Sequence, residues 1–220
     1  MDSKAVSKEI RGKVWPLLKE QGFSRFTTRT AWRYCDSKID VLNFQSFNAY
    51  NASVMRVTPF SFAVNLGSFL TYVPPDWPLQ STDGQLTPRE ADCQFRGRLI
   101  PTVTQSRKTP DGVWSVDELG RNLPRCIQDV VEQLPHAMDW FARLADKREV
   151  LRVLCEDDED MIVLWGFGRN PSPIRSYLTG YVALELENHD LAREKLGEAV
   201  DSDCFTGQFG NLKNAINRAP

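Results

Sequence analysis

Histidine and the motifs of common catalytic sites are scarce in this sequence. Only two histidines, His136 and His189, occur among 220 residues, and neither has a second histidine at metal-ligand spacing. The patterns HExxH, GxSxG and GxGxxG are absent, and GFGRNP at 166–171 does not match a phosphate-binding loop. These absences argue against a zinc site, a serine hydrolase and nucleotide binding through a glycine-rich loop. We expect no cofactor and no metal.

Long apolar segments are missing as well. No run of about 18 apolar residues exists, so we expect no membrane span. The start MDSKAVSKEIRGK is charged and lacks the apolar core of a signal peptide. The cysteines are odd in number and form no CxxC pair, which favours reduced thiols and a cytoplasmic location. They are Cys35, Cys93, Cys126, Cys155 and Cys204.

Charge of either sign is not strongly in excess. The net charge is −2, and the pI near 5.8 gives no bulk electrostatic case for nucleic-acid binding. Residues 1–130 carry 17 Lys and Arg against 13 Asp and Glu, or +4, and the last 90 carry 10 against 16, or −6. This asymmetry could direct an anionic partner to the first part of the chain, or it could reflect two different solvated surfaces.

The first part of the chain has the pattern of a sheet protein. A helix is predicted over 6–18, with a kink at Pro16 and a stop at Gly22. Four segments rich in β-branched and aromatic residues follow, at 24–34, 39–47, 59–72 and 93–100, and 112–116 could add a fifth. Runs of strands between helices predict an α+β fold with an antiparallel sheet of four to five strands packed by helices.

The later part of the chain is predicted to be helical. The cleanest apolar stripe covers 123–134 and is interrupted by Pro135, and a further helix over 147–155 leads into the acidic run 156–160, which we interpret as a solvated linker. Ser172 is expected to cap the next helix and Asp190 the one after it. We therefore predict a sheet domain at 1–145 and a helical part at 146–220.

The final pair of helices resembles a single tetratricopeptide repeat. The small and apolar positions of such a hairpin are matched by Gly180, Ala192, Leu196 and Ala199. No second copy follows, and one hairpin alone cannot form the stacked groove through which repeat arrays bind peptides. We expect the hairpin to cap the sheet domain or to make a dimer contact.

A candidate binding site lies on the predicted strands. Alternation in CQFRGRL places Arg96 and Arg98 on the face opposite Phe95 and Leu99. Arginine offers planar donors for carboxylate or phosphate, and amide side chains can form hydrogen bonds with neutral polar groups. Equally, an antiparallel sheet commonly leaves one face in water, where arginines only solubilise it. The residues that we group as a candidate site are Arg29, Asn43, Gln45, Asn65, Arg96 and Arg98.

Several short motifs occur in an order that resembles a known family. These are LKxxGF ending at Phe23, the NFQ segment 43–45, the VNLG segment 64–67, and CxxRGRL ending at Leu99, before Trp114. In this order they resemble a bacterial family catalogued only as a domain of unknown function, over roughly residues 5–145. The resemblance implies a cytoplasmic α+β domain without an assigned activity. It supports grouping Asn43, Gln45, Asn65, Arg96 and Arg98, without saying what they hold.

Three functions remain open at this point. We expect a non-enzymatic protein-interaction module, toxin-neutralising or defence-associated, whose partner is another protein or a second copy. The alternative is a binder of a small anion, or an enzyme acting on one, with Arg29, Arg96 and Arg98 as anchors and Asp40 or Glu90 as a general base. Binding of single-stranded nucleic acid to an aromatic and basic sheet is a third and less favoured possibility.

Overall fold

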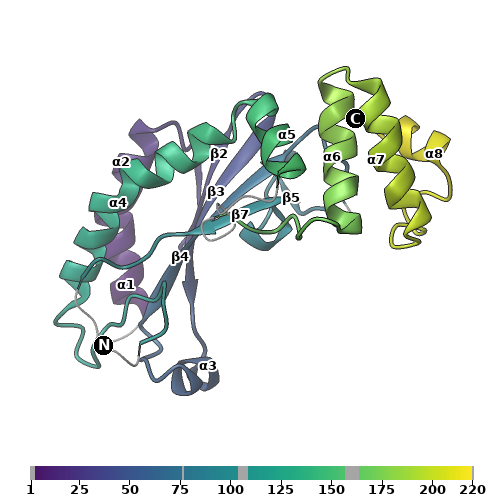
Figure 1. Ribbon diagram of the computed structural model, residues 1–220. Helices are drawn as coiled ribbons and strands as arrows, with labels where there is room; N and C mark the ends of the chain where they lie inside the picture. The colour runs from purple at the N-terminus through teal and green to yellow at the C-terminus, as the bar shows by residue number, and fades with distance from the viewer. Residues whose placement is uncertain (1–2, 76, 104–108, 157–163, 220) are drawn as a thin grey trace. The chain divides into compact units, whose positions relative to one another are not determined.

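The computed structural model describes residues 3–75, 77–103, 109–156 and 164–219 (Figure 1). The chain forms two compact units, which are treated separately below. The first consists of Met1–Tyr34, Asp40–Gly67 and Gly97–Trp140, and the second of Cys35–Ile39, Ser68–Arg96 and Phe141–Pro220. The domain boundary predicted near residue 145 stays a prediction.

The helices and strands follow one another along the chain with short connections. In chain order they are α1 (Ser3–Glu9), η1 (Ile10–Val14, a π-helical segment), α2 (Trp15–Glu20), β1 (Arg25–Phe26), β2 (Thr30–Tyr34), β3 (Lys38–Ser46), α3 (Ala49–Val54), β4 (Phe62–Leu70), β5 (Ser81–Thr82), β6 (Gln85–Leu86), η2 (Glu90–Asp92, a 3₁₀ helix), β7 (Phe95–Arg98), α4 (Leu123–Arg143), α5 (Lys147–Cys155), α6 (Pro173–Glu185), α7 (His189–Asp201) and α8 (Leu212–Asn217).

Five of the strands form one antiparallel sheet in the order β1-β2-β3-β4-β7, so each strand lies beside its neighbour in this series. This confirms the predicted α+β class, with a sheet packed by helices and a C-terminal pair of helices. The expected fifth strand at 112–116 is reduced to an isolated bridge between Phe62 and Trp114. The fifth strand comes instead from the division of segment 24–34.

The prediction of one strand over 24–34 is wrong. The chain reverses between β1 and β2, where Thr27 N donates to Thr30 O (2.8 Å) and the Thr27 hydroxyl oxygen accepts from Thr30 N (3.0 Å). In the resulting hairpin Arg25 lies opposite Trp32, so the two share a face. Arg25 and Arg33 therefore lie on opposite faces of the sheet, although a single strand would have placed them on one.

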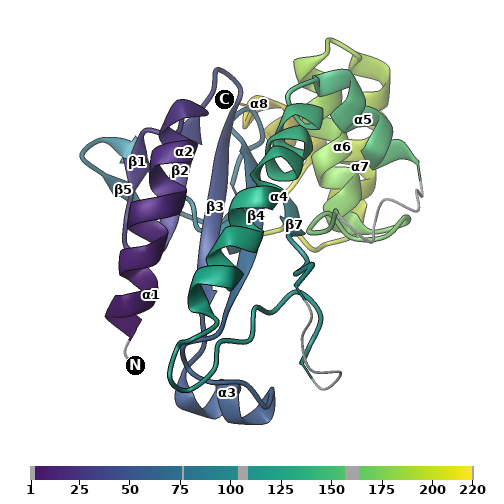
Figure 2. The same cartoon turned by 90° about the vertical axis from the view of Figure 1, so that its left-hand side faces the viewer.

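An aromatic cluster forms the centre of the first unit. The ring of Phe44 on β3 lies 5.6 Å from that of Trp15 and 5.5 Å from that of Phe62, which in turn stacks on Trp114 at 5.7 Å. Figure 2 shows α1, α2 and α4 side by side on one face of the sheet. Pro16 lies directly after the π-helical segment Ile10–Val14, so the helical hydrogen-bond pattern changes next to the proline, which has no N–H to donate.

A buried carboxylate joins α4 to the segment that follows the sheet. Asp129 is 2% exposed and accepts hydrogen bonds from Trp114 Nε1 (2.8 Å), Gln133 Nε2 (3.2 Å) and Thr102 N (3.1 Å). The Thr102 hydroxyl donates to it as well. These donors satisfy a charge that would otherwise be costly to remove from water.

A buried arginine organises the helices of the second unit. Arg175 on α6 is 2% exposed, and its guanidinium donates to Leu154 O (2.6 Å) and Val153 O (2.7 Å) at the end of α5, and to Glu156 O just beyond it. Positive charge at a helix C-terminus is favourable because the last carbonyls have no partners within the helix. The acidic residues 157–160, predicted as a linker, lie outside the described residues.

The C-terminal helices α6 and α7 pack closely. A Cβ atom on Gly180 would lie 2.6 Å from Leu196 Cγ, so glycine permits this approach, and Leu196 is fully buried. Ser172 caps α6 as predicted, because its hydroxyl accepts from Arg175 N (3.2 Å). The predicted cap of α7 is wrong by two residues, since Asn188 rather than Asp190 caps it.

We predict that Gly97→Ala destabilises the fold by about 1–3 kcal/mol, as overpacking of a full core generally does. A Cβ atom at position 97 would lie 2.8 Å from the Trp140 indole of α4. Gly12→Ala in η1 is the matched control, because a Cβ there meets nothing within 4 Å. In a helical segment this change should stabilise by about 0.5–1 kcal/mol. Urea denaturation measures both, and equal effects of the two variants would contradict the packing account.

Candidate functional site

The strand that carries the predicted arginines alternates as expected. In β7 the residues Phe95 and Gly97 are buried, and Arg96 and Arg98 are partly exposed. The CQFRGRL segment therefore contains a paired strand with both guanidinium groups on one face. Their partners, however, differ.

Three of the six predicted residues form one chain of hydrogen bonds in the first unit. Asn65 Nδ2 donates to Gln45 Oε1 (2.9 Å), and Arg98 Nε donates to Asn65 Oδ1 (2.8 Å). Asn65 is only 3% exposed, so both polar atoms of its amide are used inside the protein. This arrangement joins β3, β4 and β7 across the sheet face, and its first role is to satisfy a buried amide.

Two further predicted residues lie near the β1–β2 turn. Asn43 Nδ2 donates to Thr30 Oγ1 (2.9 Å) rather than to the Gln45–Asn65–Arg98 chain. The carbonyl of Arg29 accepts from Phe44 N (2.8 Å), which places this turn against β3. Burial lowers the pKa of the Arg29 guanidinium, because removal from water disfavours its charged form.

Arg96 belongs to the second unit and holds a carboxylate there. Its Nε lies 2.6 Å from Glu90 Oε1, and its backbone pairs with Trp165 through hydrogen bonds of 2.7 and 2.8 Å. Glu90 was one candidate base, and the other, Asp40, is fully buried and accepts from Arg33 at 2.7 and 3.0 Å. The structure thus brings Gln45, Asn65 and Arg98 together and distributes the other candidates elsewhere.

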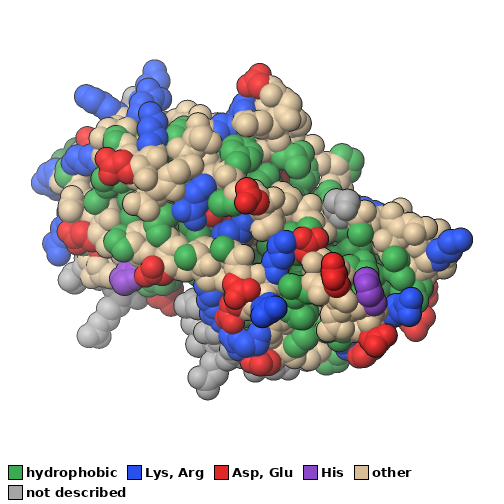
Figure 3. Space-filling view, turned by 90° about the horizontal axis from the view of Figure 1, so that it is seen from above, with side chains coloured by type: hydrophobic (Ala, Val, Ile, Leu, Met, Phe, Trp, Pro, Cys, Tyr) green, Lys and Arg blue, Asp and Glu red, His purple; other side chains and the backbone are tan. Residues whose placement is uncertain are grey.

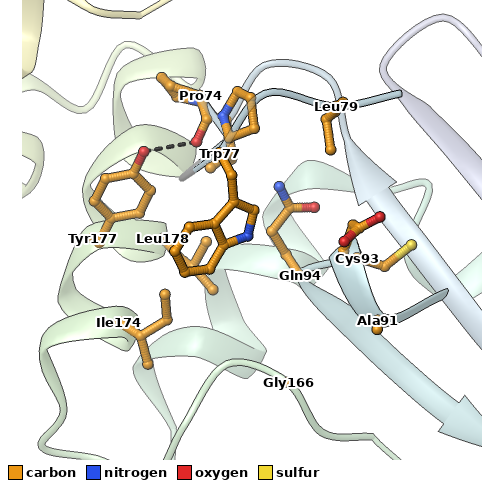
Figure 4. Close-up of a pocket in the computed structure, with 13 residues that line it drawn as sticks. Pro74, Trp77, Leu79, Ala91, Cys93, Gln94, Gly166, Ile174, Tyr177 and Leu178 are labelled. Atoms are coloured by element: carbon orange, nitrogen blue, oxygen red, sulfur yellow. Dashed lines mark hydrogen bonds between the residues drawn. The ribbon is translucent and has the colours of Figure 1, made fainter. Parts of the chain in front are cut away.

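Sequence reasoning missed a pocket in the second unit (Figure 4). Its volume is about 130 Å³, and it lies between the proline-rich segment after β4, the start of β7 and helix α6. Trp77 lines it with 65% of the residue exposed, in contrast to the partly or fully buried state of the other five tryptophans. The lining residues are Val73, Pro74, Pro75, Trp77, Leu79, Ala91, Asp92, Cys93, Gln94, Gly166, Ile174, Tyr177 and Leu178.

Hydrogen bonds hold the proline-rich wall of the pocket in place. Tyr177 Oη donates to Pro74 O (2.7 Å), drawn in Figure 4, and Arg218 Nη2 donates to Pro75 O (2.7 Å). Tyr177 is itself buried in a stack with Phe205 at 4.6 Å. The carbonyls of Pro74 and Pro75 are therefore held from two helices, by Tyr177 of α6 and by Arg218 at the end of α8.

The polar groups on the opposite wall are engaged within the protein. Gln94 Oε1 accepts from Leu70 N (2.8 Å). Asp92 accepts from Arg89 at 2.7 and 3.0 Å, and these hydrogen bonds lower the pKa of its carboxyl. These groups are engaged within the protein, and the pocket offers polar and apolar surface in about equal parts together with one indole ring. In Figure 4 that ring extends from the loop into the middle of the pocket, between the α6 side chains and Gln94.

Among the residues that the structure describes, no group of three or more His, Cys, Asp or Glu is placed to hold a metal ion. Within the same residues, no helix combines the length and the apolarity needed to cross a bilayer.

We predict that Asn65→Ala lowers the free energy of unfolding by about 1–3 kcal/mol, because the Gln45 and Arg98 groups lose their buried partner. The matched control is Asn43→Ala, where a partly exposed amide makes one hydrogen bond to Thr30. Here the loss should stay below about 1 kcal/mol. If chemical denaturation shows the same effect for both variants, the Asn65 amide is not the structural link described above.

Comparison with known proteins agrees with the sequence motifs. Residues 14–143 match the model of a family described as Domain of unknown function (DUF4304). No curated protein and no solved structure matches the chain. The matched segment covers the five-stranded sheet, the Gln45–Asn65–Arg98 chain and all of α4, and it makes up more than half of the 220 residues. The chain therefore belongs to the DUF4304 family.

Proposed function

We propose that the chain is a non-enzymatic protein-interaction module whose partner-binding surface is the Trp77 pocket. The observation that carries this proposal is an indole that is 65% exposed beside a pocket with an anchored wall. Tryptophan is one of the residue types most enriched among energetically dominant interface positions, particularly where it lies beside a pocket.

The size of the pocket favours a protein partner over a small molecule. Its 130 Å³ is below the roughly 300–1,000 Å³ of sites that enclose drug-sized ligands. It corresponds to about four waters at roughly 30 Å³ each, which is the space of one side chain. We infer that an uncharged side chain of the partner enters the pocket while its backbone lies against the indole.

The energy available from Trp77 is sufficient for a dominant contact. Covering about 100 Å² of its ring at roughly 25 cal/mol per Å² contributes about 2.5 kcal/mol. Tyr177 and Arg218 hold the carbonyls of Pro74 and Pro75 in the wall of the pocket. Less conformational freedom of this wall is therefore lost when a partner binds. The toxin-neutralising or defence setting, the bacterial cytoplasm and the choice between another protein and a second copy stay predictions.

The interaction proposal is tested with Trp77→Ala and the matched control Tyr50→Ala, which removes an aromatic that is 76% exposed on α3. Purified partner should bind Trp77→Ala at least about tenfold more weakly, as for a dominant interface residue, and Tyr50→Ala unchanged. The full-length chain is used as bait for capture and then for titration. Sedimentation of both variants at rising concentration tests a second copy as the partner.

Tryptophan emission supplies an independent readout. On binding, the emission of the wild type should shift to the blue, and that of a Trp77→Phe variant should not. Partner binding that is equally weakened by both alanine variants, or that leaves the wild-type emission unchanged, would contradict the assignment to this pocket.

Small-anion binding at the arginine-bearing face remains the alternative, although Arg96 holds Glu90 and Arg98 holds Asn65. We expect inorganic phosphate and nucleotides to leave the melting temperature unchanged. A stabilisation that disappears in Arg98→Ala and persists in Arg25→Ala would instead favour the alternative.

A further inference from the structure

The first unit contains a second concave surface, distinct from the Trp77 pocket. A groove of about 380 Å³ lies between α2 and α4, the two helices that run side by side in Figure 2. This volume falls within the range of ligand-binding sites. It is lined by Leu17, Glu20, Gln21, Val131, Leu134, Pro135, Met138 and Asp139.

The two ends of the groove differ in character. Leu17, Val131 and Leu134 line one part with aliphatic side chains. At the other part stand the carboxylates of Glu20 and Asp139, and both residues are exposed. The two carboxylates belong to the same end, because one nitrogen of Arg33 reaches both Gln21 O (3.2 Å) and Met138 Sδ (3.8 Å), the residues next to them.

The negative charge at this end is not cancelled within the described part of the chain. The Arg33 guanidinium that lies there is paired with the buried Asp40. Neither Glu20 nor Asp139 forms an ion pair with another described residue, whereas Asp92 in the Trp77 pocket is held by Arg89.

A backbone acceptor lies along the same wall. Pro135 has no N–H, so it cannot donate the helix hydrogen bond to the carbonyl of Val131, four residues earlier. Both residues line the groove. The lining therefore combines an aliphatic floor with acceptors and negative charge, and a complementary occupant needs apolar side chains together with cationic donors.

We propose that the α2–α4 groove binds an amphipathic basic segment of a partner protein. Residues 131–139 of α4 extend for about 12 Å at 1.5 Å per residue, which accommodates about two turns of a helix. A helix that places its apolar face in a groove is an established mode of recognition. The aliphatic side chains of this segment lie over Leu17 and Val131, and a Lys or Arg pairs with Glu20 and Asp139. The proposal does not depend on the Trp77 pocket.

The experiment uses the full-length chain and three labelled synthetic peptides with one helical pattern. The first contains Leu and Lys, the second has every Lys replaced by Glu, and the third has every Leu replaced by Gln. Fluorescence anisotropy at physiological salt should show binding of the Leu and Lys peptide only. Equal binding of the Glu peptide or of the Gln peptide would overturn the proposal.

The location is tested with the double variant Glu20→Gln, Asp139→Asn. Its matched control is Asp111→Asn, Glu118→Gln, two exposed carboxylates of the same unit that do not line the groove. We expect at least a fivefold loss of affinity in the first pair and no change in the second. All four substitutions are exposed and isosteric, and melting curves verify that both variants are folded.

Carbodiimide cross-linking gives a readout independent of affinity. A lysine of the bound peptide should be joined to Glu20 or Asp139, as identified by mass spectrometry. Cross-links confined to other carboxylates, or loss of binding in the control pair as large as in the groove pair, would overturn the assignment. Trp77→Ala should bind the peptide normally, which separates this result from the test of the proposed function.

Discussion

The carboxylate of Asp129 is buried in the first unit, and the packing of α4 depends on the donors that reach it. Trp114 and Thr102 supply donors from outside α4, and Gln133 supplies one from the next turn of the same helix. A buried charge without such partners would be unfavourable by several kcal/mol. The segments that carry Thr102 and Trp114 are therefore held against α4. Trp114 in turn stacks on Phe62, which connects the carboxylate to the aromatic cluster of the sheet. The second unit uses the opposite charge, since Arg175 is satisfied by carbonyls at the end of α5.

Sequence patterns predicted the parts of the fold that depend on local periodicity. The alternation in β7 and the apolar stripe of α4 were read correctly because burial there follows a period of two or of 3.6 residues. The hairpin between β1 and β2 was missed because its turn contains no Gly, Pro or Asn. The Thr27 hydroxyl oxygen accepts from the backbone instead, a weaker signal in sequence. That one turn moved Arg25 and Arg29 out of the predicted register.

The site residues likewise divide into those that strand alternation could group and those that only the tertiary structure brings together. Gln45, Asn65 and Arg98 could be grouped from parity alone, because they lie on adjacent strands of the sheet. Asp129 could not be identified, since an acidic residue within an apolar helical stripe usually faces solvent. The Trp77 pocket requires Tyr177, one hundred residues later, to meet Pro74, and no periodicity reports such a contact. The signal available in sequence was a tryptophan within a proline-rich loop.

The distinction between satisfied and available groups separates the structural polar residues from the surfaces proposed for binding. The Gln45–Asn65–Arg98 chain uses its buried amide completely, and Glu90, Asp92 and Asp40 each hold an arginine. Figure 3 shows charges of both signs interspersed with apolar side chains over the face in view, so bulk charge alone selects no partner there. Selectivity must then come from local arrangements. An indole beside a pocket whose Asp92 carboxylate is already paired with Arg89 favours a neutral side chain, whereas two uncompensated carboxylates beside an aliphatic floor favour a basic amphipathic one. The Trp77 pocket and the α2–α4 groove therefore favour partner segments of different chemistry, one neutral and one basic.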